Sequence, residues 1–464
     1  MGVAGLFDGV WVAVVSALAR LPVWFDVRVL AVPAAVCAIL MAATFFRARR
    51  LQRERVGAHR LEWRIHDLKE MLRQRLAEPR EPFVEGAGAS PTLGASAVFE
   101  ADIEAAARTV MVEAGGRRAK AKHLLRKHLN GSGLNGSEAA YWRQLGALSL
   151  LDNTRDAVRA YARAADLAPD DPQAQMLAGV LYLRDGRLDA AEAAFRRQSE
   201  LAGKEVGGAA VRYRASTMLG DTLLAKGEQA KALEAYREAQ REASAMADSA
   251  PDDAERQRDL SLTHDRIGDL QLAGGEMDAA LENYRASLGL MQVLAKRDTA
   301  RPEWQRDLSV THDRIGEALE RKGNMEGALA SHREGLRIAK ALARRHPERA
   351  DLQWDVSASL DRIGDVLLIE GKLAEALASY RQGLEIAETV VESDPRSIAR
   401  QRELAVSYHK AGTLEAQTGN DAEAVDMLER GRAIIARLDR IAEHRAQWRS
   451  DLRKFDQALE TVRP

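Results

Sequence analysis

The strongest constraint on the fold is a repeat of 48 residues in the C-terminal half of the chain. Four blocks align without gaps and begin ERQRDLSLTHDRIGDL at residue 255, EWQRDLSVTHDRIGEAL at 303, DLQWDVSASLDRIGDVL at 351 and ARQRELAVSYHKAGTLE at 399. Self-similarity at a fixed period is typical of arrays in which each unit packs only against its neighbours. The sequence therefore predicts an elongated stack of similar units.

Small residues mark the same positions in every block. They form three sets: Gly268, Gly316, Gly364 and Gly412; Gly275, Gly323, Gly371 and Gly419; and Ala280, Ala328, Ala376 and Ala424. Glycine suits the turn between two helices. We therefore expect two helices in each block, from about 256 to 273 and from about 277 to 296 in the first. The register also extends backwards, through Gly220 and Gly227, to a block that starts near residue 207.

Upstream the spacing shortens, since Gly146 and Gly179 lie 33 residues apart. The surrounding residues are Trp142, Leu145, Ala157, Tyr161 and Pro169, and then Tyr182, Ala191 and Phe195. This pattern resembles the tetratricopeptide repeat family, whose period is about 34 residues and whose motif is W-x2-L-G-x2-Y followed by Ala, an aromatic residue and Pro. The resemblance covers residues 138–443. It implies an all-α fold, an α-solenoid of stacked antiparallel helix pairs, with longer helices in the 48-residue blocks.

Segments on both sides of the array are expected to differ from it. Residues 98–137 read as an atypical first helix pair and a loop. Residues 444–464 read as a capping helix, because their apolar residues are spaced 4, 3 and 4 apart on one helical face. These residues are Trp448, Leu452, Phe455 and Leu459.

The N-terminal part predicts a membrane anchor. Residues 29–46 contain no charge, and a spanning helix needs about 17–25 apolar residues. Seven arginines follow between residues 47 and 64, whereas only Arg20 and Arg28 precede the segment. Since basic residues stay on the cytoplasmic side, we expect a single span with a cytoplasmic solenoid.

Within the N-terminal segment 1–28, residues 9–25 are apolar, but Arg20 and Pro22 interrupt them. They form either an interfacial segment, which we favour, or a weak first span.

Residues 47–78 read as a basic juxtamembrane helix, and residues 79–97, rich in Pro, Gly, Ala and Ser, as a flexible linker. Leu61, Ile65, Leu68 and Leu72 have heptad spacing in that helix. They indicate either a homodimer formed through this helix or a solvated helix with one apolar stripe.

The sequence carries no recognisable catalytic, cofactor-binding or metal-binding motif. GSGLNG at 131–136 matches a dinucleotide fingerprint, but no strand precedes it. The single Cys excludes Cys-rich zinc sites. The formal net charge of −1 argues against nucleic acid as a partner, and the basic run at 117–127 reads as a solvated helix face. We therefore expect a protein that is not an enzyme.

Three i, i+4 pairs of carboxylates recur in register and are candidate partner-binding residues. The pairs are Asp265 with Asp269, Asp313 with Glu317, and Asp361 with Asp365. The resemblance implies that the first helix of each pair lines a groove, so these carboxylates would hold a basic segment of a partner. The alternative is that the neighbouring Arg266, Arg314 and Arg362 neutralise them.

Together these features predict a membrane-anchored scaffold or adaptor that captures another protein on its solenoid. The Ala- and Arg-rich composition suggests a bacterial inner-membrane protein. Two alternatives stay open: an envelope assembly factor with a periplasmic solenoid, or a regulatory subunit of a separate membrane enzyme or sensor.

Overall fold

The fold was analysed in a computed structural model. It describes residues 93–106, 118–129, 138–203, 208–395, 397–441 and 446–462, together with Leu68, Lys69, Met71 and Leu72. Most of residues 1–92 lies outside this set, and so does the segment 131–136. None of the described helices has both the length and the apolar composition to cross a membrane. The span expected at 29–46 falls outside the described residues.

The described residues form seventeen α-helices and no strand, which confirms the expected all-α solenoid for this part of the chain. The first helices of the seven successive pairs are α5 (Glu138–Leu150), α7 (Pro172–Arg184), α9 (Gly208–Ala225), α11 (Ala254–Ala273), α13 (Pro302–Arg321), α15 (Ala350–Ile369) and α17 (Ile398–Gln417). Their second helices are α6 (Thr154–Leu167), α8 (Leu188–Leu201), α10 (Gln229–Ser249), α12 (Met277–Arg297), α14 (Met325–Arg345), α16 (Leu373–Ser393) and α18 (Asp421–Ile441).

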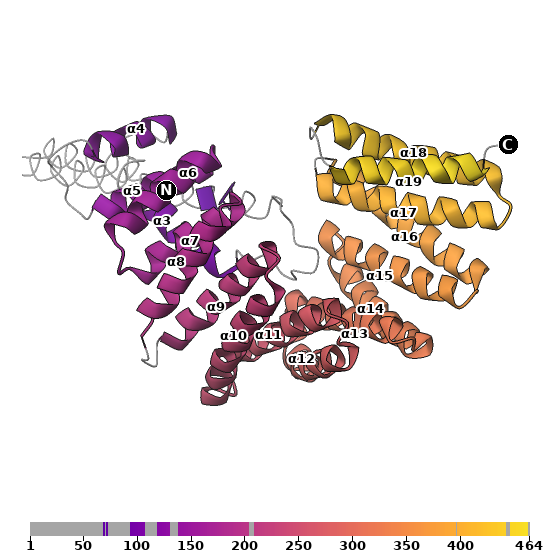
Figure 1. Ribbon diagram of the computed structural model, residues 1–464, viewed down its shortest axis with the longest axis horizontal. Helices are drawn as coiled ribbons and strands as arrows, with labels where there is room; N and C mark the ends of the chain where they lie inside the picture. Colours follow the sequence, from indigo (N-terminus) through magenta and orange to yellow (C-terminus); the bar gives the residue numbers. More distant parts are fainter. Residues whose placement is uncertain are drawn as a thin grey trace, which may run out of the picture.

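The pairs follow one another along a curved array (Figure 1). Each helix of these seven pairs packs on the one before and the one after it. First helices also contact one another: α7 contacts α9, α11 contacts α13, and α13 contacts α15. In the described residues, second helices make no contacts of this extent with one another. The first helices therefore lie on the inner side of the curve.

In the long pairs, a glycine at the turn between the two helices recurs every 48 residues and allows the chain to reverse direction there. Gly275, for example, ends α11 with φ of 81°, a left-handed conformation that glycine adopts without steric cost. The amide of Glu276 then donates to the carbonyl of Gln271 at 2.8 Å, which is the Schellman arrangement. Gly227, Gly323, Gly371 and Gly419 have the same sign of φ, so one turn geometry recurs through the long pairs.

A second glycine in each pair lets the two helices approach closely. At Gly268, an added Cβ would lie 2.6 Å from Cε1 of the Tyr284 ring. The same contact recurs in the other six pairs, where the partner side chains are Tyr161, Phe195, Tyr236, His332, Tyr380 and Leu428. We call this contact the glycine lock. It leaves no room for a methyl group, because protein interiors are close-packed.

Both ends of the array are covered. At the C-terminal end α19 (Ala446–Val462) packs on α18, and Trp448 and Phe455 are buried in the shared core. At the N-terminal end α3 (Leu93–Ala106) packs on α5 and α7, while α4 (Arg118–Leu129) packs on α5.

The N-terminal end differs from the expectation in two ways. Residues 93–97, expected in the linker, begin α3, because this Ala-rich segment favours a helix. Leu68 and Leu72, two residues of the expected heptad seam, are buried in the core of their own chain with α3 and α5. The homodimer through residues 47–78 therefore stays a prediction.

Candidate protein-binding face

The inner side of α11, α13 and α15 carries the carboxylates that the sequence singled out. Asp265 and Asp313 are buried, with exposed fractions of 3% and 8%. Asp361 is half-buried, and one of its carboxylate oxygens is buried without a hydrogen-bond partner. The other three, Asp269, Glu317 and Asp365, have side chains that are 20%, 44% and 33% exposed.

The partners of these carboxylates come from the following repeat. Arg314 of α13 reaches back to α11, where its Nε donates to Asp269 at 2.9 Å and its Nη1 to Asp265 at 3.1 Å. Arg362 of α15 donates in the same way to Asp313 at 3.2 Å. Each arginine of the D-R-I-G motif thus pairs with the preceding repeat and not with the aspartate beside it in sequence.

The same arrangement extends to the neighbouring repeats. Nε of Arg266 lies 3.3 Å from Asp221 of α9, and Nζ of Lys410 lies 2.6 Å from Asp365. We call these four joints the inner ladder. It joins successive first helices by ion pairs. The pairs of Arg266 and Arg314 are largely buried, whereas the side chains of Arg362 and Lys410 are 44% and 31% exposed.

Tyrosines of the second helices complete several of these sites. The hydroxyl of Tyr284 donates to Asp269 at 2.8 Å, and that of Tyr380 donates to Asp365 at 2.6 Å. In the α13–α14 pair the tyrosine is replaced by His332, whose Nδ1 lies 3.0 Å from Asp313. Glu317 is consequently left to pair with Arg321 of its own helix, at 2.6 Å.

Burial controls the electrostatics of the inner ladder. It raises the pKa of Asp265 to about 6, although the charge of Arg314 acts in the opposite direction. Burial also raises the pKa of Asp361, against the hydrogen bond that Ser407 donates to it. Burial lowers the pKa of Arg314, but the nearby Asp269 and Asp265 outweigh this and keep it above its usual value. The ladder therefore keeps the pKa of Arg314 above its usual value and raises the pKa of Asp265, its most buried carboxylate, to about 6.

A second ladder joins the same helices nearer their N-termini. Nε of Arg258 lies 2.6 Å from Asp307, and Nε of Arg306 lies 2.6 Å from Asp355. At the end of the array Nε of Arg402 lies 3.1 Å from Asp451 of α19. Two charged contacts thus fix the α11–α13 joint and the α13–α15 joint, and the arginine of the recurring Q-R-D motif supplies one of them in each case.

Sequence reasoning missed an apolar row on the same side of the first helices. Its members stand three residues before the first carboxylate of each block, or before His409 in the last one, so they share that face of the helix. They are Leu262, Val310, Ala358 and Val406. The first three are partly exposed, and Val406 is 38% exposed. Their 48-residue spacing, the same as that of the glycines, was the signal that could have found them.

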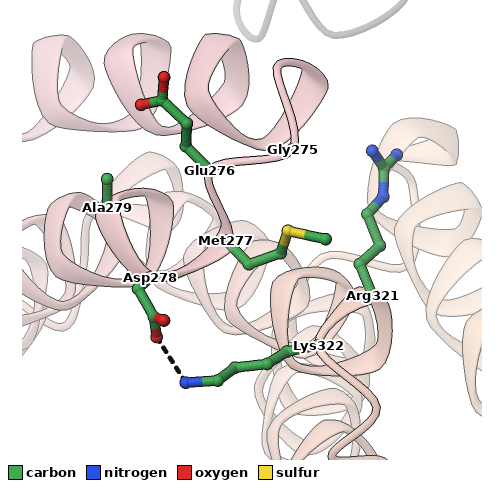
Figure 2. Close-up of a pocket in the computed structure, with 7 residues that line it drawn as sticks. All are labelled: Gly275, Glu276, Met277, Asp278, Ala279, Arg321 and Lys322. Atoms are coloured by element: carbon green, nitrogen blue, oxygen red, sulfur yellow. Dashed lines mark hydrogen bonds and ion pairs between the residues drawn. The ribbon is translucent and has the colours of Figure 1, made fainter.

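A hollow lies where the turn between α11 and α12 meets the end of α13 (Figure 2). Three of its four charged side chains are already engaged: Lys322 pairs with Asp278, and Arg321 donates to Glu317 and to the carbonyl of Leu272. Among the described residues no group of three or more His, Cys, Asp or Glu side chains is placed to hold a metal ion. The apolar row and the partly exposed carboxylates beside it remain the best candidate for a binding face.

Comparisons with known proteins agree with this architecture. Tetratricopeptide repeat models match residues 150–199, 213–245 and 357–390, so the chain contains tetratricopeptide repeats. No curated protein matches it in sequence.

Several solved structures have a similar fold. The apo form of RapI is 14% identical, with 62% of this chain and 94% of that chain covered and a TM-score of 0.42. A Rap protein complexed with competence and sporulation factor is 11% identical, with 87% and 99% covered and a TM-score of 0.39. A signal transduction ATPase with a tetratricopeptide repeat sensor from Pyrococcus horikoshii is 12% identical, with 74% and 52% covered and a TM-score of 0.41. At these values the similarity concerns the repeat architecture only.

Proposed function

We propose that this chain is a membrane-anchored scaffold, not an enzyme, that captures a segment of another protein on the inner face of α11, α13, α15 and α17. The observation that carries the proposal is the apolar row, which runs through four consecutive repeats at one position per repeat. A row of this kind offers side-chain contacts at a regular spacing to an extended or helical segment.

The charges beside the row favour a partner with basic residues. Glu317 and Asp365 are the most exposed of the six carboxylates, at 44% and 33% of the side chain. Asp265 and Asp313 are buried in their ion pairs. Glu317 and Asp365, although paired with Arg321 and Lys410, keep part of their surface open to a partner. We therefore expect the partner to place apolar side chains on the row and a Lys or Arg near Glu317 and Asp365.

The ladders make this face rigid before anything binds. A surface whose side chains are already ordered loses little conformational entropy on association. This supports capture of a flexible segment, because only the partner then loses much conformational entropy on binding.

Site-specific photo-crosslinking tests the proposal. A photoreactive residue is placed at Leu262, Val310 or Val406 on the inner face, and at Val293 of α12 as the control. Val293 is 66% exposed and lies on a second helix. We expect a discrete crosslinked protein from the three inner positions and none from Val293. Equal crosslinking from both faces, or crosslinking from Val293 alone, would refute the inner-face assignment.

The membrane anchor and the cytoplasmic side rest on the sequence, through the uncharged segment 29–46 and the arginines that follow it. Fusions of alkaline phosphatase and of β-galactosidase after residue 464 test them in a bacterial host. We expect an active galactosidase and a silent phosphatase in the membrane fraction. An active phosphatase would move the solenoid to the periplasm and favour an envelope assembly factor.

A further inference from the structure

The inner face of the first two pairs is occupied by a helix of the same chain. α3 packs on α5 and on α7, two first helices, and it has no comparably extensive contact with α4, its neighbour in sequence. Among the described pairs of the array, the glycine lock joins each first helix to its second helix. No such lock is found between α3 and α4 in the described residues. α3 is therefore held on α5 and α7 by side chains on one of its faces, without the glycine lock that joins the helices of a pair.

The apolar contacts of α3 follow a helical spacing. Phe99 and Ile103, at i and i+4, are both 0% exposed, and they share a core with Leu145 and Tyr161. The rings of Phe99 and Tyr161 meet edge to face, with centroids 5.3 Å apart. These contacts bury one stripe of α3 against the first two pairs.

A carboxylate between these two residues makes the polar contact. Asp102 accepts from Nε and Nη2 of Arg143 at 3.1 and 2.9 Å, and from the hydroxyl of Tyr161 at 3.0 Å. The arginine and the tyrosine belong to α5 and α6, so one pair supplies both donors. Elsewhere in the array a carboxylate of a first helix receives the same two kinds of donor, as Asp221 does from Arg266 and Tyr236. Arg143 and Tyr161 of the first pair thus receive from α3 a carboxylate of the kind that Arg266 receives from the preceding repeat.

Three residues of the predicted juxtamembrane helix also contact α3 or share its core. Leu68 and Leu72 are buried in the same core, and Nζ of Lys69 lies 2.7 Å from Glu104 of α3. The attachment of α3 is thus linked to residues 68–72.

We propose that the inner face of α5 and α7 is a binding site for an amphipathic helix and that α3 fills it in cis. A partner helix with the same pattern, an aromatic residue and an aliphatic residue four apart with a carboxylate just before the second, binds there only by displacing α3. The site lies on other helices than the face proposed above, so the two proposals stand or fall independently.

The test uses the full chain in detergent micelles and a fluorescent peptide with the sequence of residues 93–106. In the double variant F99A/I103A, α3 holds its site weakly, and the fraction of open chains rises. Because apparent affinity scales with the fraction that is competent to bind, we expect the peptide to bind this variant at least about tenfold more tightly than the parent chain. A peptide that itself carries F99A/I103A should not bind.

Leu459→Ala in α19 is the matched control. It removes a buried side chain from the opposite end of the array, where Leu459 is 5% exposed, and leaves α3 in place. This variant should bind the peptide no better than the parent chain. Equal binding to both variants, or no binding to F99A/I103A while α5–α8 remain protected from hydrogen exchange, overturns the proposal.

The F99A/I103A substitutions could instead unfold the first two pairs, and hydrogen exchange would detect this. If F99A/I103A loses exchange protection throughout α5–α8, the test moves to Asp102→Asn, which keeps the apolar contacts and weakens the pairing with Arg143. We expect a severalfold gain in peptide affinity for this variant. Loss of protection there as well would show that α3 is an integral part of the fold and would refute the proposal.

Discussion

Replacing Arg314 by Met should destabilise the centre of the array, and more strongly at alkaline than at acidic pH. The guanidinium is 16% exposed and donates to Asp269 and Asp265. Removing one member of a buried ion pair costs about 3–5 kcal/mol, because the other charge is left without compensation. Tyr284 still donates to Asp269, so we expect a loss near the lower end, about 3 kcal/mol.

The pH dependence follows from Asp265. Its pKa in the folded chain is about 6, above the ordinary value of 3.8. A carboxyl with a raised pKa contributes stability that is fully present below pH 3.8 and is lost as the pH rises through 6. Without Arg314 the pKa rises further, so at pH 5 Asp265 is protonated and the penalty is smaller. The cost should fall by at least about 1 kcal/mol between pH 8 and pH 5, since one pKa unit corresponds to about 1.4 kcal/mol.

Hydrogen exchange of peptides from α11 and α13, at pH 8 and pH 5, measures this locally. A local readout is needed because repeat arrays do not unfold as one unit. Arg285→Met is the control, since Arg285 lies exposed on α12 and exposed substitutions usually stay within about 0.5 kcal/mol. A loss below about 1 kcal/mol, or a loss that does not change with pH, would show that the inner ladder is not a buried ion-pair system.

Three further substitutions test the packing of the repeats. Gly268→Ala should cost about 1–3 kcal/mol in the hydrogen exchange of α11 and α12, because its Cβ would lie 2.6 Å from the Tyr284 ring. Gly289→Ala, with no atom within 4 Å, should gain about 0.4–1 kcal/mol. Gly275→Ala should cost about 1–2 kcal/mol, because its φ of 81° is left-handed, and a neutral result in the same assay would contradict the turn assignment. Trp448→Ala should remove about 3–5 kcal/mol from the C-terminal cap and lower exchange protection in α17 and α18 while α9 and α10 keep theirs.

The helical boundaries of the long pairs could be predicted because glycine marks them directly. The sequence predicted helices at 256–273 and 277–296, and the structure has α11 at Ala254–Ala273 and α12 at Met277–Arg297. Few residue types adopt the left-handed conformation of such a turn, so a glycine in the local sequence is enough to predict its position. The 48-residue repeat also marked Gly268 and its equivalents, but not the ring that each of them contacts.

The partners of the candidate residues could not be predicted, because they depend on which helices meet. Sequence reasoning set Arg314 beside Asp313, its neighbour in the chain. In the structure Arg314 belongs to the carboxylates of α11, which lie 45 and 49 residues earlier. Successive residues of a helix point in different directions, so adjacency in sequence is a poor guide to pairing. The place of α3 was missed for a related reason, since its pattern predicts a helix but not the face that it covers.

These pairings also bear on how the array can serve as a scaffold. If the arginines of the inner ladder had paired within their own repeat, each of these joints would have at most the contact of the second ladder besides its apolar contacts, and the curvature could vary from one state to another. Pairing across each joint ties the spacing of the first helices to the geometry of an arginine fork, which is directional. The apolar row lies on those same helices, so its members are held at a fixed spacing. A partner is then selected by whether its side chains match that spacing, and substitutions at Arg314 or Arg362 should weaken capture without touching the partner.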